Sequence, residues 1–258
     1  MTILSQIYRY PVKGLSAEAL DRVDLVAGGG VPLDRTFAIA HGSAPFDPAR
    51  PQSLEKTHFL MLMRNERLAK LTTAYDGQSG HLTILRDGKQ VARGDLGQAV
   101  GRQVIEQFLA AFLGDEVRGS PRIVTAGDQL LSDVGLPLIS LINLASVAEL
   151  GQVLRTEVHP LRFRGNLYLD GAAPWQEFDW LDHEVQIGGA RLKVVARTER
   201  CAATNVNPET AARDMQIPLA LKRAYGHMDM GVYARVVAGG PVKTGDPLTH
   251  LQTGSTQS

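Results

Sequence analysis

Short runs that alternate apolar and polar residues dominate the first ninety positions of the chain. Residues 19–26 alternate, residues 36–40 form a short apolar run, and residues 82–92 place Asp87-Gly88 between two strand-like arms. Alternation with a period of two is typical of half-buried strands, and Asp-Gly favours a two-residue hairpin turn. The pattern therefore predicts paired antiparallel strands in this region.

Residues 100–113 carry the clearest helical pattern, with apolar side chains three and four positions apart and Gly114 as a stop signal. The spacing predicts one buried face, formed by Val100, Val104, Ile105, Phe108, Leu109 and Phe112. We expect this helix to close the N-terminal part of the fold.

Two further helices are predicted in the second half of the chain. Residues 140–154 contain a candidate helix, which Asn143 could cap, or Ser146 as part of a Ser-x-x-Glu box. Residues 218–225 form another, which Gly226 would end.

The remaining C-terminal segments again have the pattern of strands. The candidates are residues 165–170, 184–187, 190–196 and 231–238, with Gly188-Gly189 as a turn between the second and the third. Many short strands with few helices predict a mainly β fold with α decoration, arranged as a barrel or a sandwich.

Composition narrows the class of protein. The chain has 258 residues, enough for its own core, and its 27 Lys+Arg balance its 27 Asp+Glu, which argues against a dedicated nucleic-acid or anionic-membrane binder. No apolar run approaches the ~20 residues of a membrane span, and we expect a cytoplasmic protein. Cys201, the single cysteine, cannot form an internal disulfide.

Cys201 is the first candidate for chemistry. It follows a strand-like run, and Arg197 and Arg200 supply positive charge that favours the thiolate form of a cysteine, whereas Glu199 acts in the opposite direction. A thiolate can serve as a nucleophile or as a ligand for a soft metal. An inert buried cysteine is the alternative at this point.

The seven histidines show no metal-ligand spacing, and without a second cysteine a structural zinc site is excluded. A cysteine hydrolase or acyl transferase would need His159, His183 or His227 as a base. Each of these is equally consistent with an ordinary surface or packing histidine.

A set of basic residues suggests anion binding. Arg162 and Arg164 lie two apart, on one side of a predicted strand, with Asn166 following in step. Together with Lys13 and Arg35 they could hold a phosphorylated cofactor, since guanidinium groups bind phosphate bidentately. The alternative for each one is a solvated surface charge. Neither GxGxxG nor GxxxxGK[ST] occurs.

Six segments in order resemble the MOSC family, the molybdenum-cofactor sulfurase C-terminal-like proteins. They are YPVKG (10–14), PLDRTFAIA (32–40), FRGNLYLDG (163–171), RTERCAATNVNPET (197–210), GVYARVV (231–237) and GDPL (245–248). The resemblance spans nearly the whole chain and includes the N-terminal lobe found in mitochondrial amidoxime-reducing components and their bacterial relatives. It implies an N-terminal β-barrel lobe at 1–118 and a MOSC β-barrel domain at 119–250. The polar composition of the last residues, TGSTQS, separately predicts a disordered tail at 251–258.

The same resemblance implies a site. In the amidoxime-reducing branch the matching cysteine is the protein ligand to molybdenum, so Cys201 would supply a thiolate beside the two dithiolene sulfurs of molybdopterin, a choice suited to a soft metal. The implied cofactor-binding residues are Lys13, Gly14, Arg35, Arg162, Arg164, Asn166, Arg200, Thr204, Asn205 and Asn207. The chemistry would be independent of pyridoxal phosphate.

The resemblance implies a molybdenum-dependent oxidoreductase that removes oxygen from N-hydroxylated or N-oxide substrates. Because the sequence has no cysteine cluster for an iron–sulfur centre, we expect electrons from a separate flavin or iron–sulfur reductase. The alternative is a carrier of sulfur or of the molybdenum cofactor that uses a Cys201 persulfide or thiolate. Glu199 and Asn207 depart from the residues common in relatives. A third alternative is a binding module that has lost the metal, because the Glu199 carboxylate would lie beside an anionic molybdenum centre.

Overall fold

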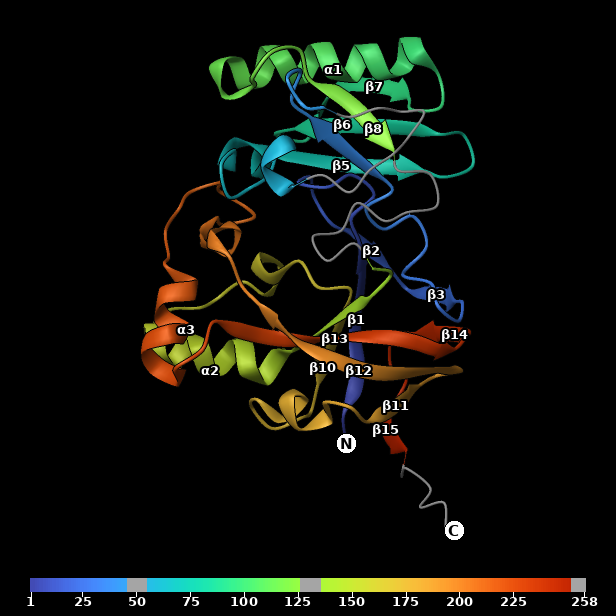
Figure 1. Cartoon of the computed structure of the whole chain (residues 1–258), viewed down its shortest axis with the longest axis vertical. Coiled ribbons are helices and arrows are strands. Elements are labelled where there is room, and N and C mark those ends of the chain that lie inside the picture. The colour runs from blue at the N-terminus through green and yellow to red at the C-terminus, as the bar shows by residue number, and fades with distance from the viewer. Residues whose placement is uncertain (46–54, 126–135, 252–258) are drawn as a thin grey trace.

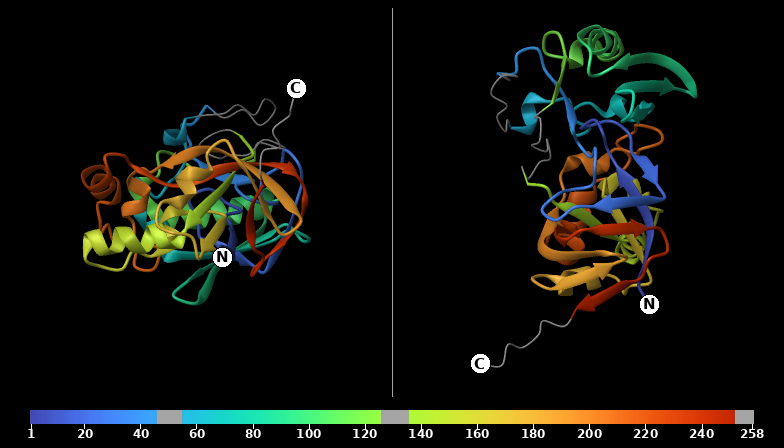
Figure 2. Two further views of the ribbon diagram at one scale, coloured as in Figure 1. Left: turned by 90° about the horizontal axis from the view of Figure 1, so that it is seen from below. Right: turned by 90° about the vertical axis from the view of Figure 1, so that its right-hand side faces the viewer.

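The computed structural model describes residues 1–45, 55–125 and 136–251 of the chain. Figure 1 shows two lobes, an upper one with a long helix over three strands and a lower one built around a large curled sheet. The right-hand view of Figure 2 shows the same two lobes from the side. The predicted fold class, mainly β with α decoration, is confirmed. Among the described residues, no helix has the length and apolar character needed to cross a bilayer.

The elements alternate between short strands and a few helices. The strands are β1 (Ile3–Arg9), β2 (Glu18–Leu20), β3 (Arg22–Leu25), β4 (Phe37–Ala40), β5 (Leu71–Asp76), β6 (His81–Arg86), β7 (Lys89–Asp95), β8 (Arg122–Thr125), β9 (Ile139–Asn143), β10 (Leu167–Asp170), β11 (Glu184–Ile187), β12 (Ala190–Glu199), β13 (Asp229–Ala238), β14 (Gly240–Lys243) and β15 (Leu248–Leu251). The α-helices are α1 (Ala99–Leu113), α2 (Leu144–Leu154) and α3 (Ile217–Tyr225). The 3-10 helices are η1 (Lys56–His58), η2 (Glu66–Lys70), η3 (Gly114–Glu116), η4 (Pro160–Phe163), η5 (Gln176–Trp180) and η6 (Ala202–Asn205).

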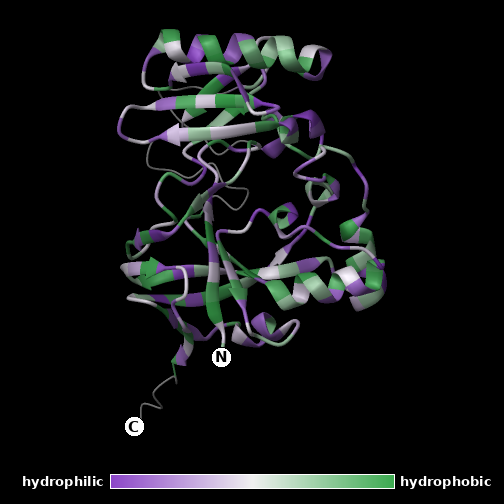
Figure 3. Cartoon of the chain, turned by 180° about the vertical axis from the view of Figure 1, so that it is seen from behind, coloured by the Kyte–Doolittle hydropathy of each residue, from purple (hydrophilic) through white to green (hydrophobic). Residues whose placement is uncertain are grey.

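The large sheet has the strand order β15-β11-β12-β13-β9-β10-β1-β2 and curls so that the start of β1 contacts the segment that leads into β15. The Leu4 amide donates to the Asp246 carbonyl at 2.8 Å, and the Leu248 amide donates to the Thr2 carbonyl at 2.9 Å. Hydrophobic and hydrophilic positions alternate along its strands, as Figure 3 shows. The apolar side chains that point inward form one continuous core, so the sheet is a half-barrel filled by its own side chains.

Strand pairing crosses the predicted domain boundary at residue 118. β1 pairs with β10, and β3 pairs with β14, so the first 25 residues complete the sheets of the lower lobe. The division into 1–118 and 119–250 stays a prediction. Of the predicted tail 251–258, only Leu251 is described, as the last residue of β15.

The upper lobe contains the hairpin predicted at Asp87-Gly88. Arg86 at the end of β6 is paired with Lys89 at the start of β7, and the two residues between them have φ angles of 51° and 73°. Two consecutive positive φ angles are the geometry of the tight turn that Asp-Gly favours. This prediction is confirmed.

Helix α1 forms as predicted but is rotated about its axis. The buried positions include Ile105, Leu109, Phe112 and Leu113. Val100 and Val104, predicted to be buried, are 73% and 42% exposed. The reason is Gly101, which packs so closely on β7 that an added Cβ would lie 2.1 Å from the Asp95 carbonyl oxygen. This contact turns the two valines outward.

The second predicted helix begins directly after one of its two predicted caps. Residues 139–143 form β9, a strand buried on both faces, and α2 starts at Leu144. The side chain of Asn143 accepts a hydrogen bond from the Ala145 amide at 3.0 Å, so Asn143 is the N-cap. Of the two predicted caps, Asn143 is therefore confirmed, whereas the Ser146 hydroxyl donates to Glu177 instead.

A buried carboxyl group connects β9, α2 and η5 by hydrogen bonds. Strand β9 also reaches the site described below. Glu177 is fully buried, and its Oε2 accepts hydrogen bonds from Asn143 Nδ2 and from Ser146 Oγ, both at 2.8 Å. Burial raises the pKa of the Glu177 carboxyl, although these hydrogen bonds act in the opposite direction.

The buried carboxyl predicts a pH dependence of stability. A carboxyl whose pKa is raised by folding stabilises the folded state below its unfolded pKa of about 4.3 and loses that contribution as the pH rises through the raised value. The difference in unfolding free energy between wild type and Glu177→Gln, measured with denaturant from pH 4 to pH 8, should therefore fall with rising pH and then level off. A difference that is flat over this range would contradict the buried, shifted carboxyl.

Candidate functional site

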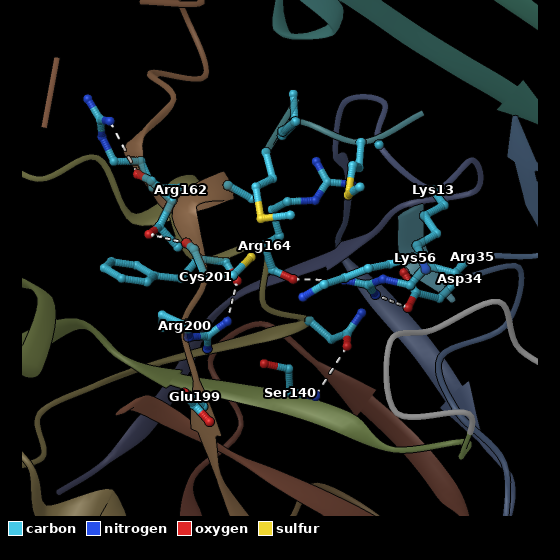
Figure 4. A pocket seen from close by; sticks show the side chains of 18 of the residues that line it. Lys13, Asp34, Arg35, Lys56, Ser140, Arg162, Arg164, Glu199, Arg200 and Cys201 are labelled. Carbon is cyan, nitrogen blue, oxygen red and sulfur yellow. Dashed lines mark hydrogen bonds and ion pairs between the residues drawn. The ribbon is translucent and has the colours of Figure 1, made fainter. Parts of the chain in front are cut away.

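A cavity of about 150 Å³ lies where the two lobes meet, and Cys201 is on its wall. Segments from both lobes line it: Lys13, Gly14, Asp34, Arg35, Lys56, Met61, Leu62, Met63, Leu138, Ser140, Arg162, Phe163, Arg164, Asn166, Glu199, Arg200, Cys201, Ala203, Thr204 and Tyr233. In Figure 4 the labelled side chains converge on one space, with Lys13 and Arg35 on one side and Arg200 and Cys201 on the other.

Most of the site residues predicted from sequence meet at this cavity. Those that line it are Lys13, Gly14, Arg35, Arg162, Arg164, Asn166, Arg200, Cys201 and Thr204. The other two do not. Asn205 accepts a hydrogen bond from the Ile217 amide at 2.9 Å, at the start of α3, and Asn207 Nδ2 donates to Asp214 at 2.9 Å. Both asparagines therefore organise the loop around them.

Asn166 lines the cavity, but its side chain joins strands. Its Oδ1 accepts from the Ser140 amide at 3.1 Å, and its Nδ2 donates to the Tyr8 carbonyl at 3.2 Å. These bonds use the amide group to connect the segments that precede β10 with β9 and β1. Its contact with a cofactor stays a prediction.

Lys13 and Gly14 follow the end of β1, where the chain turns sharply under the upper lobe. Gly14 has a φ angle of +87°, which residues with a side chain rarely adopt. An added Cβ would also lie only 3.0 Å from the Leu60 carbonyl oxygen, so both backbone conformation and space favour glycine here. The Lys13 amide donates to the Phe37 carbonyl at 2.8 Å, and its ammonium lies 5.3 Å from the centroid of the Phe59 ring. The turn fixes the base of the lysine at the cavity wall.

Arg35 and Arg164 are held by unusual backbone geometry and by each other. Their φ angles are 51° and 50°, in the left-handed region that residues other than glycine seldom occupy. Arg35 Nη2 donates to the Arg164 carbonyl at 3.0 Å, and the two guanidinium groups lie 4.9 and 4.2 Å from the centroid of the Tyr10 ring. Such strain is concentrated at functional sites, where surrounding contacts enforce it.

Two of the four arginines have carboxylate partners. Arg35 Nη1 binds Asp34, and Arg162 Nη2 lies 2.6 Å from Asp214 Oδ1. Burial alone would lower the pKa of Arg35, but the Asp34 carboxylate outweighs it and the pKa is raised. The charges of these two arginines are largely neutralised before any ligand binds.

Arg164 and Arg200 have no carboxylate partner among the described residues. Arg164 Nη1 donates to the Leu15 carbonyl at 2.8 Å, and Arg200 donates at 2.8 Å to the carbonyls of Met230 and Phe163. Burial lowers the pKa of both guanidinium groups, because it removes water without supplying an anion. A bound anion would repay that desolvation.

Cys201 is partly exposed, at the start of η6. Its carbonyl accepts hydrogen bonds from the Thr204 amide at 3.1 Å and from the Thr204 hydroxyl at 2.9 Å, which fixes the backbone that carries the thiol. Two buried polar atoms of the cavity wall, Ser140 Oγ and Arg162 Nε, have no hydrogen-bond partner within residues 1–45, 55–125 and 136–251. A charged, polar ligand beside the thiol fits these residues.

The histidines of the hydrolase hypothesis lie elsewhere. His159 accepts a hydrogen bond from the Leu161 amide at 3.1 Å, His183 contacts the Leu181 carbonyl, and His227 packs 5.4 Å from the Phe178 ring. Among the described residues that line the cavity there is no histidine, so this wall offers no imidazole base to Cys201. The described part of the chain also holds no cluster of three His, Cys, Asp or Glu side chains that could bind a metal ion.

Several lining residues were not predicted from sequence. They are Asp34, Lys56, Met61, Leu62, Met63, Leu138, Ser140, Phe163, Ala203 and Tyr233. Asp34 could have been found, since an acidic residue next to a candidate anion-binding arginine suggests a paired charge. Ser140 and Tyr233 give no such signal, because β9 and β13 bring them to the cavity only through their pairing in the sheet.

Comparison with known proteins adds two family models and a group of relatives. The model of the MOSC N-terminal beta barrel domain matches residues 1–118, and the model of the MOSC domain matches residues 138–249. The crystal structure of the YUAD protein from Bacillus subtilis overlaps 96% of this chain and 94% of its own, with 15% identity and a TM-score of 0.45.

The curated relatives are amidoxime-reducing components. Mitochondrial amidoxime reducing component 2 of Bos taurus is 28% identical over 125 residues, which are 44% of this chain and 37% of the relative. Mitochondrial amidoxime-reducing component 1 of Homo sapiens is 29% identical over 120 residues, which are 42% of this chain and 35% of the relative. The matched stretch thus covers little more than a third of each relative. Because the two domain models match in order and together span most of its length, the chain belongs to the MOSC family, with a MOSC N-terminal beta barrel domain followed by a MOSC domain.

Proposed function

We propose that this protein binds a molybdenum cofactor, with Cys201 as the protein ligand to the metal, and reduces N-hydroxylated compounds with electrons from a separate protein. One observation carries the proposal. The only thiol of the chain shares a cavity with two half-buried guanidinium groups, those of Arg164 and Arg200, which have no carboxylate partner among the described residues. The names of the curated relatives, amidoxime reducing components, support the reaction type.

The side chains around the cavity suggest a division of roles. Arg164 and Arg200 would bind the anionic parts of the cofactor, since their charges are otherwise uncompensated. Lys13 would add a point charge from the opposite wall. Arg35 and Arg162 would act more weakly as anion contacts, because Asp34 and Asp214 already pair with them.

When bound, the cofactor would supply two-electron redox chemistry together with the two dithiolene sulfurs that complete a soft ligand set with Cys201. Removal of one oxygen from a hydroxylamine or amidoxime as water consumes two electrons and two protons. The protein would hold the thiolate sulfur at a fixed point, through the Thr204 hydrogen bonds to the Cys201 carbonyl. The electron donor would be an external flavin or iron–sulfur protein.

Glu199 does not stand against this proposal. Its side chain is exposed at the rim of the cavity, so water screens its carboxylate from a negative centre beside Cys201. The backbone at Glu199 is paired with Asp229 in the β12–β13 ladder, and this pairing positions the next residue, Arg200, whose side chain donates hydrogen bonds within the fold.

Replacement of Cys201 tests the metal ligand. Wild type produced in a cofactor-competent host should carry close to one molybdenum and one pterin per chain, and it should reduce benzamidoxime with an artificial electron donor. Cys201→Ala should lose molybdenum by more than about tenfold, because a soft metal centre prefers a thiolate ligand. Elemental analysis and fluorescence of the oxidised pterin measure both quantities.

Three outcomes separate the candidates. Wild type with neither molybdenum nor pterin would sink the proposal. A Cys201 persulfide, or bound cofactor without turnover of any N-hydroxylated compound, would favour the sulfur or cofactor carrier. Cys201→Ser is the matched variant, since it keeps the size of the side chain and removes only the sulfur.

Because Arg164 has no carboxylate partner among the described residues, its replacement should affect protein stability and cofactor binding in different ways. In cofactor-free protein, Arg164→Met should leave the unfolding free energy unchanged or raise it by up to about 2 kcal/mol, because it removes a buried, unpaired charge. Arg162→Met should lower it by about 1–3 kcal/mol, because hydrogen bonds to Asp214 and to two carbonyls are lost. Denaturant unfolding gives both values.

Cofactor content provides the second half of this comparison. Pterin per chain should fall further in Arg164→Met than in Arg162→Met, the reverse of the order expected from stability. If Arg164→Met were the less stable of the two variants, Arg164 would be a structural arginine and the anion-binding role would be refuted.

A further inference from the structure

The segment after η6, residues 206–214, is fixed to the lower lobe at its end. Asp214 Oδ1 accepts from Arg162 Nη2 at 2.6 Å, and Asp214 Oδ2 accepts from Asn207 Nδ2 at 2.9 Å. The side chain of Arg162 is only 1% exposed, so this end of the segment is held by a buried guanidinium group. We call residues 206–214 the cysteine-side loop, because they continue the segment that begins at Cys201.

The preceding residue, Arg213, reaches across to the upper lobe. Its Nη2 donates to the carbonyls of Leu62 and Met63 at 3.1 and 2.8 Å and lies 2.9 Å from Glu66 Oε2. These acceptors belong to the turn before η2 and to its first residue. Figure 1 shows the loop rising from the lower lobe at this point toward the upper lobe.

The two segments that Arg213 joins both contribute to the wall of the cavity. Leu62 lines the cavity from the upper lobe, and Ala203 lines it from the side of Cys201. Both also border a second cavity of about 210 Å³, which Val206 and Pro208 of the cysteine-side loop line as well. One guanidinium group therefore connects two segments that line both cavities.

This connection is of a kind that can be loosened. The side chains of Arg213 and Glu66 are 34% and 40% exposed, so water and salt weaken the ion pair. The backbone of Arg213 forms an isolated β-bridge with Val206, so the main chain of Arg213 is held within the cysteine-side loop. Loss of its side-chain bonds would release the Leu62 wall while the loop stays anchored at Asp214.

We propose that Arg213 is a specificity-determining residue, which fixes the width of the opening above Cys201 and so admits narrow ligands in preference to broad ones. The claim rests on the two walls and the three acceptors of Arg213. It does not rest on which cofactor binds, and its test uses the cofactor-free chain.

The reporter is Cys201 itself, because a chain with one cysteine gives one alkylation product. Purified cofactor-free protein is treated separately with N-methylmaleimide and N-(1-pyrenyl)maleimide, two uncharged reagents that share one reaction and differ in width. The ratio of the two rates, small over large, is measured by mass spectrometry. In Arg213→Ala this ratio should fall at least threefold from wild type, with a smaller fall in Glu66→Gln, which keeps the two carbonyl acceptors.

Arg223→Ala is the matched control, since Arg223 is an exposed arginine on α3 that does not line the cavity. Its rate ratio should equal that of wild type, and Arg213→Lys should lie between wild type and Arg213→Ala. High salt should lower the ratio in wild type and leave Arg213→Ala unchanged. Folding of each variant is checked by circular dichroism, and Glu66→Gln keeps the test valid if Arg213→Ala does not fold. A ratio in folded Arg213→Ala or in Glu66→Gln that matches Arg223→Ala would overturn the proposal.

Discussion

The guanidinium groups of Arg164 and Arg200 lie half-buried in the cavity that Cys201 lines, and in the described part of the chain their hydrogen bonds go to backbone carbonyls. Carbonyl dipoles keep such groups in place but do not neutralise their charge, and the lowered pKa of each arginine records the cost. A fold that keeps two unpaired cations in one cavity has a strong preference for an anionic ligand there. The proposed cofactor follows from this preference combined with the adjacent thiol.

The architecture explains how this cavity is maintained. Closure of the large sheet brings β1 against β15, and the segment after β1 then carries Lys13 to the same place as the segments after η4 and β12. The left-handed conformations of Arg35 and Arg164 survive because Tyr10 and the hydrogen bond between the two arginines over-determine them. Rigidity at the arginines contrasts with the cysteine-side loop, whose hydrogen bonds to the described residues of the upper lobe come from the half-exposed side chain of Arg213.

Local signals in the sequence predicted local structure well. The Asp87-Gly88 hairpin and the end of α1 at Gly114 depend on backbone preferences of single residues, and the sequence reveals those directly. The rotation of α1 and the strand at 139–143 depend on neighbours far along the chain, so periodicity alone misplaced Val100 and Val104. For the site, motif resemblance identified Cys201 and most of the basic residues. It could not reveal which arginines are paired, because Asp214 lies 52 residues from Arg162 and no local pattern connects them.

The most direct test of the central claim is X-ray absorption spectroscopy at the molybdenum edge of cofactor-loaded protein, which counts the sulfur atoms bound to the metal. The account predicts three in wild type, two from the dithiolene and one from Cys201, and two in Cys201→Ser. The same sulfur count in both proteins would contradict it, because the thiol beside the unpaired arginines would then not be a ligand.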